Sequence, residues 1–301
     1  MKKILQFGPL FIIFAALLWA LDGVLRISLG SLPPAVTVFY SDLFGFIVLL
    51  FIIKTWVGDL KKMTKKEWIA IIIVALFSEA LGTILYTAAL QMTKFLPYSV
   101  VAVLEQQLQP IFAIIAASIL LKEKMTKNFL MWAALAIVSI YLVTFKNLEV
   151  NTQTGSQTII AAVLAISSGF MWGSSTAISK FVLNKVKPLT ATAERFSFGA
   201  FFALLFIFPQ GQTHALFQLT QTQIWTLIAI TFSTGMVATA IYYYGLKRTP
   251  ARVSAICELA FPAAAVLIDY FYYHNTLSVT QIIGFLILIL SMTQVTRNFK
   301  K

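Results

Sequence analysis

The chain has 301 residues, of which 59% are hydrophobic and 11% are charged, and its mean hydropathy is +0.86. A soluble domain cannot bury so large a share of apolar sequence, so the composition excludes a soluble globular protein and indicates one that crosses a membrane several times. The formal net charge of +12 would also fit a nucleic-acid-binding protein, so the positions of the basic residues have to decide between the two.

Ten apolar windows are long enough to cross a bilayer, which takes about 20 helical residues. In chain order they cover residues 8–28, 35–55, 68–89, 98–121, 129–146, 158–182, 189–209, 223–245, 251–273 and 279–296. The first window follows Lys2 and Lys3, as a secretory signal would, but it is too long for a signal and lacks a convincing cleavage site. The sequence therefore predicts an all-α membrane protein with ten transmembrane helices.

The basic residues between these windows fall almost entirely on one side. If the N-terminus is cytoplasmic, the cytoplasmic loops and ends hold 18 lysines and arginines, whereas the opposite side holds only Lys94 and Lys146. This asymmetry is the positive-inside signal. We therefore expect a multi-pass protein of the cytoplasmic (inner) membrane with both termini in the cytoplasm. Its basicity then reflects topology and contact with lipid headgroups rather than a nucleic-acid partner.

The chain divides into two similar halves of five windows each. Trp19 matches Trp172, Pro97 matches Pro250 and Glu105 matches Glu258 at an offset of 153 residues, residues 89–93 match 245–249 at 156, and Pro110 matches Pro262 at 152. We predict a first repeat over residues 1–146, a polar linker over 147–157 and a second repeat over 158–301. Because five is odd, the second repeat is inverted, which is typical of secondary transporters that work by alternating access. The alternative is a duplicated scaffold with no transport role.

Short motifs carry a resemblance to a known family. They are Trp172-Gly173 followed by Lys180, and the run Leu121-Lys122-Glu123-Lys124-Met125-Thr126, in which Glu123 lies thirteen residues after Pro110. Together with the 5+5 arrangement, they resemble the EamA-type branch of the drug/metabolite transporter superfamily over almost the whole chain. The resemblance implies a helical bundle that carries small metabolites, often by export, and does not name the metabolite.

Two positions depart from the pattern of that family. Asn275 stands where a glutamate is expected, thirteen residues beyond Pro262, and Asp42 stands where an arginine is common. Asp42 is the repeat equivalent of Arg195, which fits the family pattern. The acid at position 42 reverses the local charge and argues against transferring anion specificity from relatives.

Carboxylates inside the windows are the main candidates for a binding or proton-coupling site, because charged groups at the bilayer centre usually line a cavity. Glu105 and Glu258 are repeat equivalents and precede Pro110 and Pro262 by five and four residues. A proline bends a helix and frees a carbonyl, which membranes tolerate mainly where protein or a cavity satisfies it. We expect at least one of the two acids to line the cavity; the alternative is a pair of kinks that serve packing alone.

Further candidates surround these two glutamates. The remaining deep acids are Asp22, Asp42 and Glu79, and Asp22 can pair with Arg26 one turn along the helix. Desolvation disfavours the charged form of an unpaired carboxylate, which suits a group that exchanges protons. The polar run at residues 105–109 adds Gln106 and Gln109 as binding residues. The aromatic candidates are Trp19, Trp172, Tyr40, Tyr86 and Tyr242 to Tyr244, for which core packing or an interfacial belt is the alternative.

Three charged side chains lie near the ends of predicted helices: Arg26, Lys180 and Asp269. We expect them to anchor in the headgroup region. The two histidines, His214 and His274, are isolated, and the single cysteine, Cys257, excludes a multi-cysteine metal site. We expect no metal, no cofactor and no enzymatic activity, since no nucleophile is clustered with a base.

The deep acids outnumber the deep bases, which favours a small cationic or zwitterionic metabolite such as an amino acid or an amine. We therefore predict a secondary active transporter, coupled to protons or to exchange and acting as a monomer or homodimer. The alternative is a carrier of an anionic or nucleotide-like metabolite, and an intramembrane enzyme or a receptor is a remote one.

Overall fold

The computed structural model describes residues 7–92, 100–149, 158–272 and 274–298, apart from the side chains of residues 27, 100–107, 158 and 298. Nine helical segments in these ranges are long and apolar enough to cross a membrane, and a shorter apolar one covers Leu108–Leu120. All regular secondary structure of the described ranges is helical. The predicted all-α membrane fold is therefore confirmed.

The helical segments follow the ten predicted windows. The first half holds α2 (Gly8–Ile27), α3 (Pro34–Phe51), a third span built from α4 (Lys65–Val74), η3 (Ala75–Gly82) and α5 (Thr83–Met92), then α6 (Val100–Leu120) and α7 (Lys127–Thr144). The second half holds α8 (Thr158–Leu183), α9 (Pro188–Ile207), α10 (Gln221–Phe232) with α11 (Met236–Leu246), α12 (Ala251–Cys257) with α13 (Ala260–Tyr272), and α14 (Val279–Asn298). Short 3-10 turns lie at Ile53–Thr55 (η1), Val57–Lys62 (η2), Lys146–Leu148 (η4) and Thr213–Phe217 (η5).

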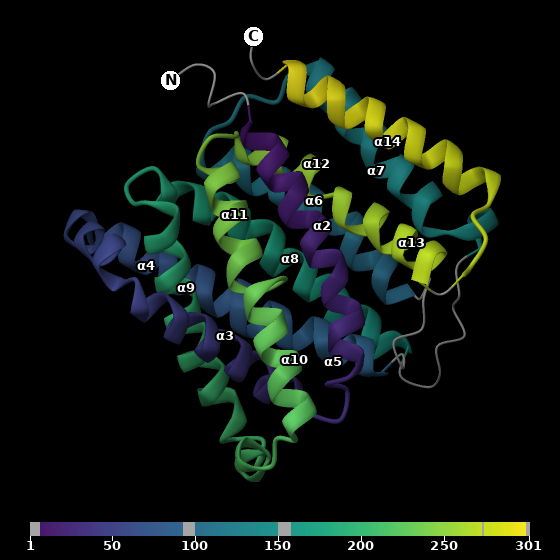
Figure 1. Ribbon diagram of the computed structural model, residues 1–301. Coiled ribbons are helices and arrows are strands. Elements are labelled where there is room, and N and C mark those ends of the chain that lie inside the picture. Colours follow the sequence, from purple (N-terminus) through teal and green to yellow (C-terminus); the bar gives the residue numbers. More distant parts are fainter. Residues whose placement is uncertain (1–6, 93–99, 150–157, 273, 299–301) are drawn as a thin grey trace.

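The helix packing follows the division into halves (Figure 1). The first span, α2, packs against α11, and the sixth, α8, packs against the α4–η3–α5 span. Likewise α6 packs against α8, and α12 and α13 pack against α2. The remaining pairs are α3 with α9 and α7 with α14. If each helix is replaced by its equivalent in the other half, the same set of pairs results. For example, the pair α2 with α11 becomes the pair α8 with the α4–η3–α5 span, and the pair α3 with α9 is unchanged. This is the arrangement expected of two repeats of one fold.

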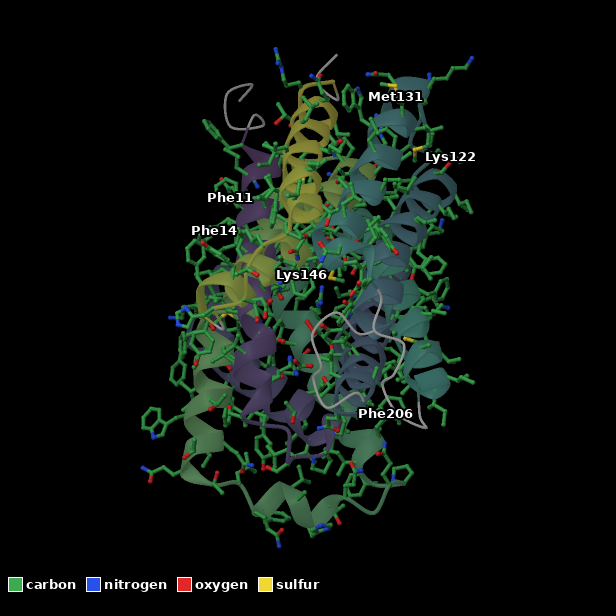
Figure 2. The ribbon with its side chains drawn as sticks, turned by 90° about the vertical axis from the view of Figure 1, so that its right-hand side faces the viewer. Phe11, Phe14, Lys122, Met131, Lys146 and Phe206 are labelled. Carbon is green, nitrogen blue, oxygen red and sulfur yellow. The ribbon has the colours of Figure 1, made fainter. Side chains whose placement is uncertain are left out.

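The described chain begins and ends at the same end of the bundle (Figure 1). Lys122 lies at that end, whereas Phe206 lies toward the opposite one (Figure 2). We call the end at which the described chain begins and ends the basic end, because the loops with Lys62, Lys122, Lys187 and Lys247 lie there. Large apolar side chains such as Phe14, which is 52% exposed, project outward along the bundle as lipid-facing residues do (Figure 2).

Three spans are irregular near the middle of the bundle. The third contains the π-helical stretch η3, and the eighth is interrupted at Ser233 to Gly235, where Ser233 has φ −123° and ψ −81°. The ninth is interrupted between α12 and α13, at Glu258 and Leu259. Pro262 lies four residues after Glu258, and a proline clashes with the carbonyl four residues before it. The carbonyl of Glu258 instead accepts from the amide of Phe261 at 2.9 Å, in a tighter turn.

The prolines therefore act differently in the two halves. The sequence predicts a bend at both, and the ninth span does break one turn before Pro262, whereas α6 continues through Pro110. The interruption of the eighth span at Ser233 to Gly235 has no proline near it and was not predicted.

Candidate functional site

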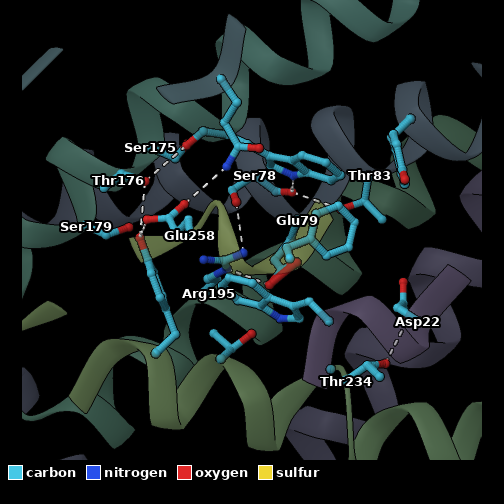
Figure 3. Close-up of a pocket in the computed structure, with 18 of the residues that line it drawn as sticks. Asp22, Ser78, Glu79, Thr83, Ser175, Thr176, Ser179, Arg195, Thr234 and Glu258 are labelled. Atoms are coloured by element: carbon cyan, nitrogen blue, oxygen red, sulfur yellow. Dashed lines mark hydrogen bonds and ion pairs between the residues drawn. The ribbon is translucent and has the colours of Figure 1, made fainter. Parts of the chain in front are cut away.

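A cavity lies where the irregular segments meet. Residues of both halves line it, and the close-up shows their side chains converging (Figure 3). The polar and aromatic lining residues used below are Trp19, Asp22, Arg26, Asp42, Ser78, Glu79, Tyr86, Gln109, Trp172, Thr176, Arg195, Thr234, Tyr242 and Glu258. Irregular backbone inside a membrane is tolerated where it borders such a cavity.

Glu258 is the centre of a hydrogen-bonded cluster that joins four spans (Figure 3). Its Oε1 accepts from the Tyr242 hydroxyl at 2.8 Å and from the Ser254 hydroxyl at 2.9 Å, and its Oε2 accepts from Gln109 Nε2 at 3.2 Å. The Tyr242 hydroxyl also lies 3.1 Å from Thr176 Oγ1. Because α12 ends just before Glu258, the carboxylate is held at the break in the ninth span, where it faces donors from α6, α11 and α12.

Arg195 and Glu79 form a buried ion pair between α9 and η3, with Nε and Oε1 2.5 Å apart. The other two nitrogens of the guanidinium donate to Ser78 Oγ at 2.8 Å and to the Tyr243 hydroxyl at 3.1 Å. The Tyr243 hydroxyl lies 3.0 Å from Ser179 Oγ. The π-helical stretch places Ser78 and Glu79 side by side against the arginine, which fits the frequent use of such bulges at functional sites.

Asp42 lies beside this ion pair but does not take part in it. Its Oδ2 is buried and has no hydrogen-bond partner among the described residues. The oxygen is pressed against Gly199 on α9, where any Cβ would collide with it and would also lie 2.8 Å from Glu79 Cβ. Only a glycine at position 199 therefore lets α9 approach the two acids so closely.

Asp22 and Arg26 form a second ion pair, one helical turn apart on α2, as the sequence predicted. Asp22 Oδ1 also accepts from the Thr234 hydroxyl at 2.6 Å, at the break in the eighth span (Figure 3). Arg26 is only 8% exposed and lines the cavity, so the expectation that it anchors in lipid headgroups is wrong. The nearby acid explains the difference, because a paired guanidinium can stay buried where a lone one would reach for water.

Two aromatic pairs are related by the repeat. Trp19 packs on Tyr242 with ring centroids 5.0 Å apart and planes inclined by 53°, and Trp172 packs on Tyr86 at 5.0 Å and 56°. The tryptophans are 153 residues apart and the tyrosines 156, so the two pairs correspond. Trp172 Nε1 also donates to the carbonyl of Ser78 at 2.8 Å. All four rings line the cavity.

Several contacts between loops and helix ends lie at the basic end. Glu123 accepts from the amides of Ala251 and Arg252 at 2.7 and 3.1 Å, which satisfies the N-terminus of α12. Lys180 Nζ donates to the carbonyls of Leu246 and Lys247 at 2.8 and 2.9 Å, which satisfies the C-terminus of α11. Lys180 therefore caps a helix, and its expected place at the level of the headgroups stays a prediction.

The sequence-predicted site residues can now be placed. Nine of the twelve with described side chains line the cavity: Trp19, Asp22, Asp42, Glu79, Tyr86, Gln109, Trp172, Tyr242 and Glu258. The other three, Tyr40, Tyr243 and Tyr244, are not among its lining residues. The side chains of Glu105 and Gln106 lie outside the described part of the chain, so their roles stay predictions. Sequence reasoning missed the hydroxyl partners Ser78, Thr176, Ser179 and Thr234. Serine and threonine are too common in membrane helices to mark a site. Only the fold brings Ser78 to Arg195 and Thr234 to Asp22, and the other two to the hydroxyls of Tyr242 and Tyr243.

Within the described residues, no group of three or more His, Cys, Asp or Glu side chains could hold a metal ion. What the cavity offers is a set of hydrogen-bond donors and acceptors, two paired arginines and aromatic faces. This chemistry can bind and orient a small molecule.

Comparison with known proteins also indicates a transporter. The model of the EamA-like transporter family matches residues 6–145 and 159–297. The chain is 32% identical over 294 residues to the riboflavin transporter ImpX of Fusobacterium nucleatum subsp. nucleatum, covering 96% of this chain and 97% of that one. It is 24% identical over 286 residues to an uncharacterized transporter of Archaeoglobus fulgidus, covering 94% and 93%. One crystal structure shares the fold, with a TM-score of 0.74 at 16% identity over 96% of each chain.

Proposed function

The chain belongs to the EamA-like transporter family, and from this premise we propose that it is a secondary transporter of riboflavin or a similar uncharged, ring-bearing metabolite. It is a multi-pass membrane transporter and not an enzyme. The observation that carries the choice of substrate is the likeness to a riboflavin transporter over 96% of the chain.

The lining of the cavity supports this choice. Riboflavin combines a planar ring system with a chain of hydroxyl groups, and it carries no charge near neutral pH. The two aromatic pairs, Trp19 with Tyr242 and Trp172 with Tyr86, offer faces and edges to a ring. The cavity also presents amide and hydroxyl groups, such as Gln109 and Thr176, to the hydroxyl chain. Small-molecule sites are typically concave, largely apolar and furnished with a few such polar groups.

Contacts at the basic end support alternating access between the two repeats. Glu123, in the loop after α6, contacts the N-terminus of α12, and Lys180 joins α8 to the C-terminus of α11. We propose that the basic end faces the cytoplasm, in accordance with the positive-inside rule, and that substrate meets the cavity from the other side in this conformation. Rocking of one repeat against the other would break these caps and open the basic end.

Transport of riboflavin by the purified protein in lipid vesicles tests the proposal. Vesicles loaded with unlabelled riboflavin should take up labelled riboflavin faster than protein-free vesicles. Lumichrome, which keeps the ring system and lacks the hydroxyl chain, should compete weakly, and riboflavin phosphate should compete poorly because the two arginines lining the described cavity are already paired with acids. Absence of both riboflavin binding and exchange in folded protein would refute the substrate.

A second candidate substrate class is a cationic or zwitterionic metabolite, as the sequence suggested. Its support is the excess of acids in the described lining, where Asp22, Asp42, Glu79 and Glu258 face Arg26 and Arg195. A thermal-shift screen against amino acids, polyamines, nucleosides and riboflavin separates the two candidates, because a ligand stabilises the folded protein according to its occupancy. Stabilisation by amines alone would favour the second.

A further inference from the structure

Three charged residues from three different spans meet at the wall of the cavity. Asp42 comes from α3, Glu79 from η3 and Arg195 from α9. All three nitrogens of the Arg195 guanidinium are already engaged. Glu79 and Ser78 bind two of them (Figure 3), and Tyr243 binds the third. Asp42 Oδ2 is left buried without a partner among the described residues. One cation therefore faces two carboxylates, and it is bound to only one of them.

One other described cation, Arg26 on α2, lies close enough to act on Asp42, and it is bound through Nε to Asp22. Its buried Nη1 has no hydrogen-bond partner among the described residues. The elements packed against α3 also carry Glu79 on η3, Tyr86 on α5, Glu194 and Arg195 on α9, and Tyr242 to Tyr244 on α11. Each arginine of the described cavity thus has its own acid, and Asp42 is the third acid of a group with two cations. Glu258 differs, because three neutral donors satisfy its oxygens.

A buried carboxylate without a partner is costly, and binding a proton removes the cost, since the neutral acid needs no counterion. A proton also allows Asp42 to lie next to Glu79 without repulsion between like charges. Water entering the open cavity can bring this proton to the carboxyl group, because Asp42 is one of the residues that line the cavity.

We propose that Asp42 is the binding site of the coupling proton, and that Arg195 controls it. In this conformation Arg195 is bound to Glu79, and the proton resides on Asp42. When Arg195 turns to Asp42, it replaces the proton, which leaves to the solution on the side then open. Asp42 and Arg195 are repeat equivalents 153 residues apart and sit where α3 and α9 pack together. Relative motion of the two repeats therefore changes the distance between them. This inference rests on the proposed secondary transport.

Infrared difference spectroscopy of the purified full-length protein in lipid vesicles at neutral pH tests the proton site without any substrate. Subtracting the spectrum of Asp42→Asn from that of the wild type should leave the carbonyl band of one protonated carboxylic acid, that of Asp42. The same band should be lost in Glu79→Gln, because Arg195 is then free to pair with Asp42. The matched control Glu258→Gln should retain it. An unchanged band in Asp42→Asn overturns the site, and one that persists in Glu79→Gln overturns the exchange of the arginine.

The Glu79→Gln variant leaves Asp42 itself intact, so the test remains decisive if Asp42→Asn fails to fold. Transport gives the second readout. The quantity to measure is riboflavin uptake driven by an imposed pH gradient, divided by riboflavin counterflow. In Asp42→Asn this ratio should fall to the value measured without a gradient, and a full response to the gradient contradicts the proposal. Lack of riboflavin movement in the wild type refutes the proposed substrate instead, and the infrared result still decides the proton site.

Discussion

Single side chains in the cavity have well-defined tasks, and Glu258 is the clearest case. Its two oxygens accept three hydrogen bonds from Tyr242, Ser254 and Gln109, which tie together helices of both halves. A carboxylate suits this place because it only accepts hydrogen bonds, and all three neighbours donate. The group therefore stabilises the arrangement of the helices around the cavity as well as facing its interior.

We expect Glu258→Gln to lower transport about ten- to a hundredfold, because hydrogen bonds to a charged group are worth roughly 1.5–3 kcal/mol and the new amide would turn a donor toward Gln109 or Tyr242. Initial rates of exchange in vesicles, at equal amounts of inserted protein, measure the loss. Glu149→Gln, at an exposed position outside the spans, is the matched control and should behave as the wild type. Equal rates for both variants would remove Glu258 from the working site.

The sequence predicts much of this site and leaves out a definable part. Glu258, Asp22 and Gln109 could be picked out because polar groups in apolar windows are rare. The bond between Glu79 and Arg195 could not, since the partners are 116 residues apart and the π-helical stretch decides which side chain meets the arginine. The interruption of the eighth span at Ser233 to Gly235 escaped prediction for a related reason. Its sequence contains no proline, and only tertiary packing selects this backbone.

Whole elements depend on single small residues where they cross. α3, η3 and α9 meet at Gly199, where a side chain would collide with Asp42 and Glu79. Similarly, a Cβ on Gly173 of α8 would lie 2.9 Å from Phe112 Cβ on α6. Small residues at crossings let membrane helices approach closely, and van der Waals packing then holds them together.

Replacing Gly199 by alanine should destabilise the protein by about 1–3 kcal/mol, the usual cost of overpacking a tight interface. Thermal unfolding in detergent should show a lower midpoint for Gly199→Ala. Gly58→Ala is the control, because a Cβ at Gly58 meets nothing within 4 Å. A midpoint unchanged in Gly199→Ala would mean that α9 moves away from Asp42 without penalty.

The start of α9 at the basic end gives a pH-dependent contact. Asp59 accepts from Lys62 Nζ at 2.6 Å and from the amide of Lys187 at 2.9 Å, and these bonds lower the pKa of its carboxyl. A lowered pKa in the folded state stabilises the protein above the ordinary aspartate value, about 3.9. Stability from this contact should thus be constant near neutral pH and decline only as the pH falls through about 4 and below. Unfolding midpoints across this range should show a shallower decline in Asp59→Asn; an identical decline contradicts the role.

At the scale of the molecule, a few polar contacts link the segments at the basic end, both between the two halves and within the second. Glu123 on the first half caps α12 on the second, and Lys180 joins α8 to α11. Cys257, the single cysteine, lies buried at the end of α12. The rate at which a thiol reagent reaches Cys257 therefore reports whether the basic end is open.

We expect a thiol reagent to label Cys257 slowly in the wild type and several times faster in Glu123→Ala, because loss of the cap frees the N-terminus of α12, a contribution worth about 1 kcal/mol. Mass spectrometry of the timed reaction measures the rate. The exposed Glu149→Ala serves as control. Equal labelling rates in the two variants would show that the cap does not hold this end closed.

Each of the two tryptophan–tyrosine pairs takes one ring from either half of the chain: Trp19 with Tyr242, and Trp172 with Tyr86. The first half carries Trp19 and Tyr86 and the second carries Trp172 and Tyr242, so every ring of this set packs on a ring from the other half. Neither half can therefore form either pair by itself, and a change to any one ring alters a contact that both halves share.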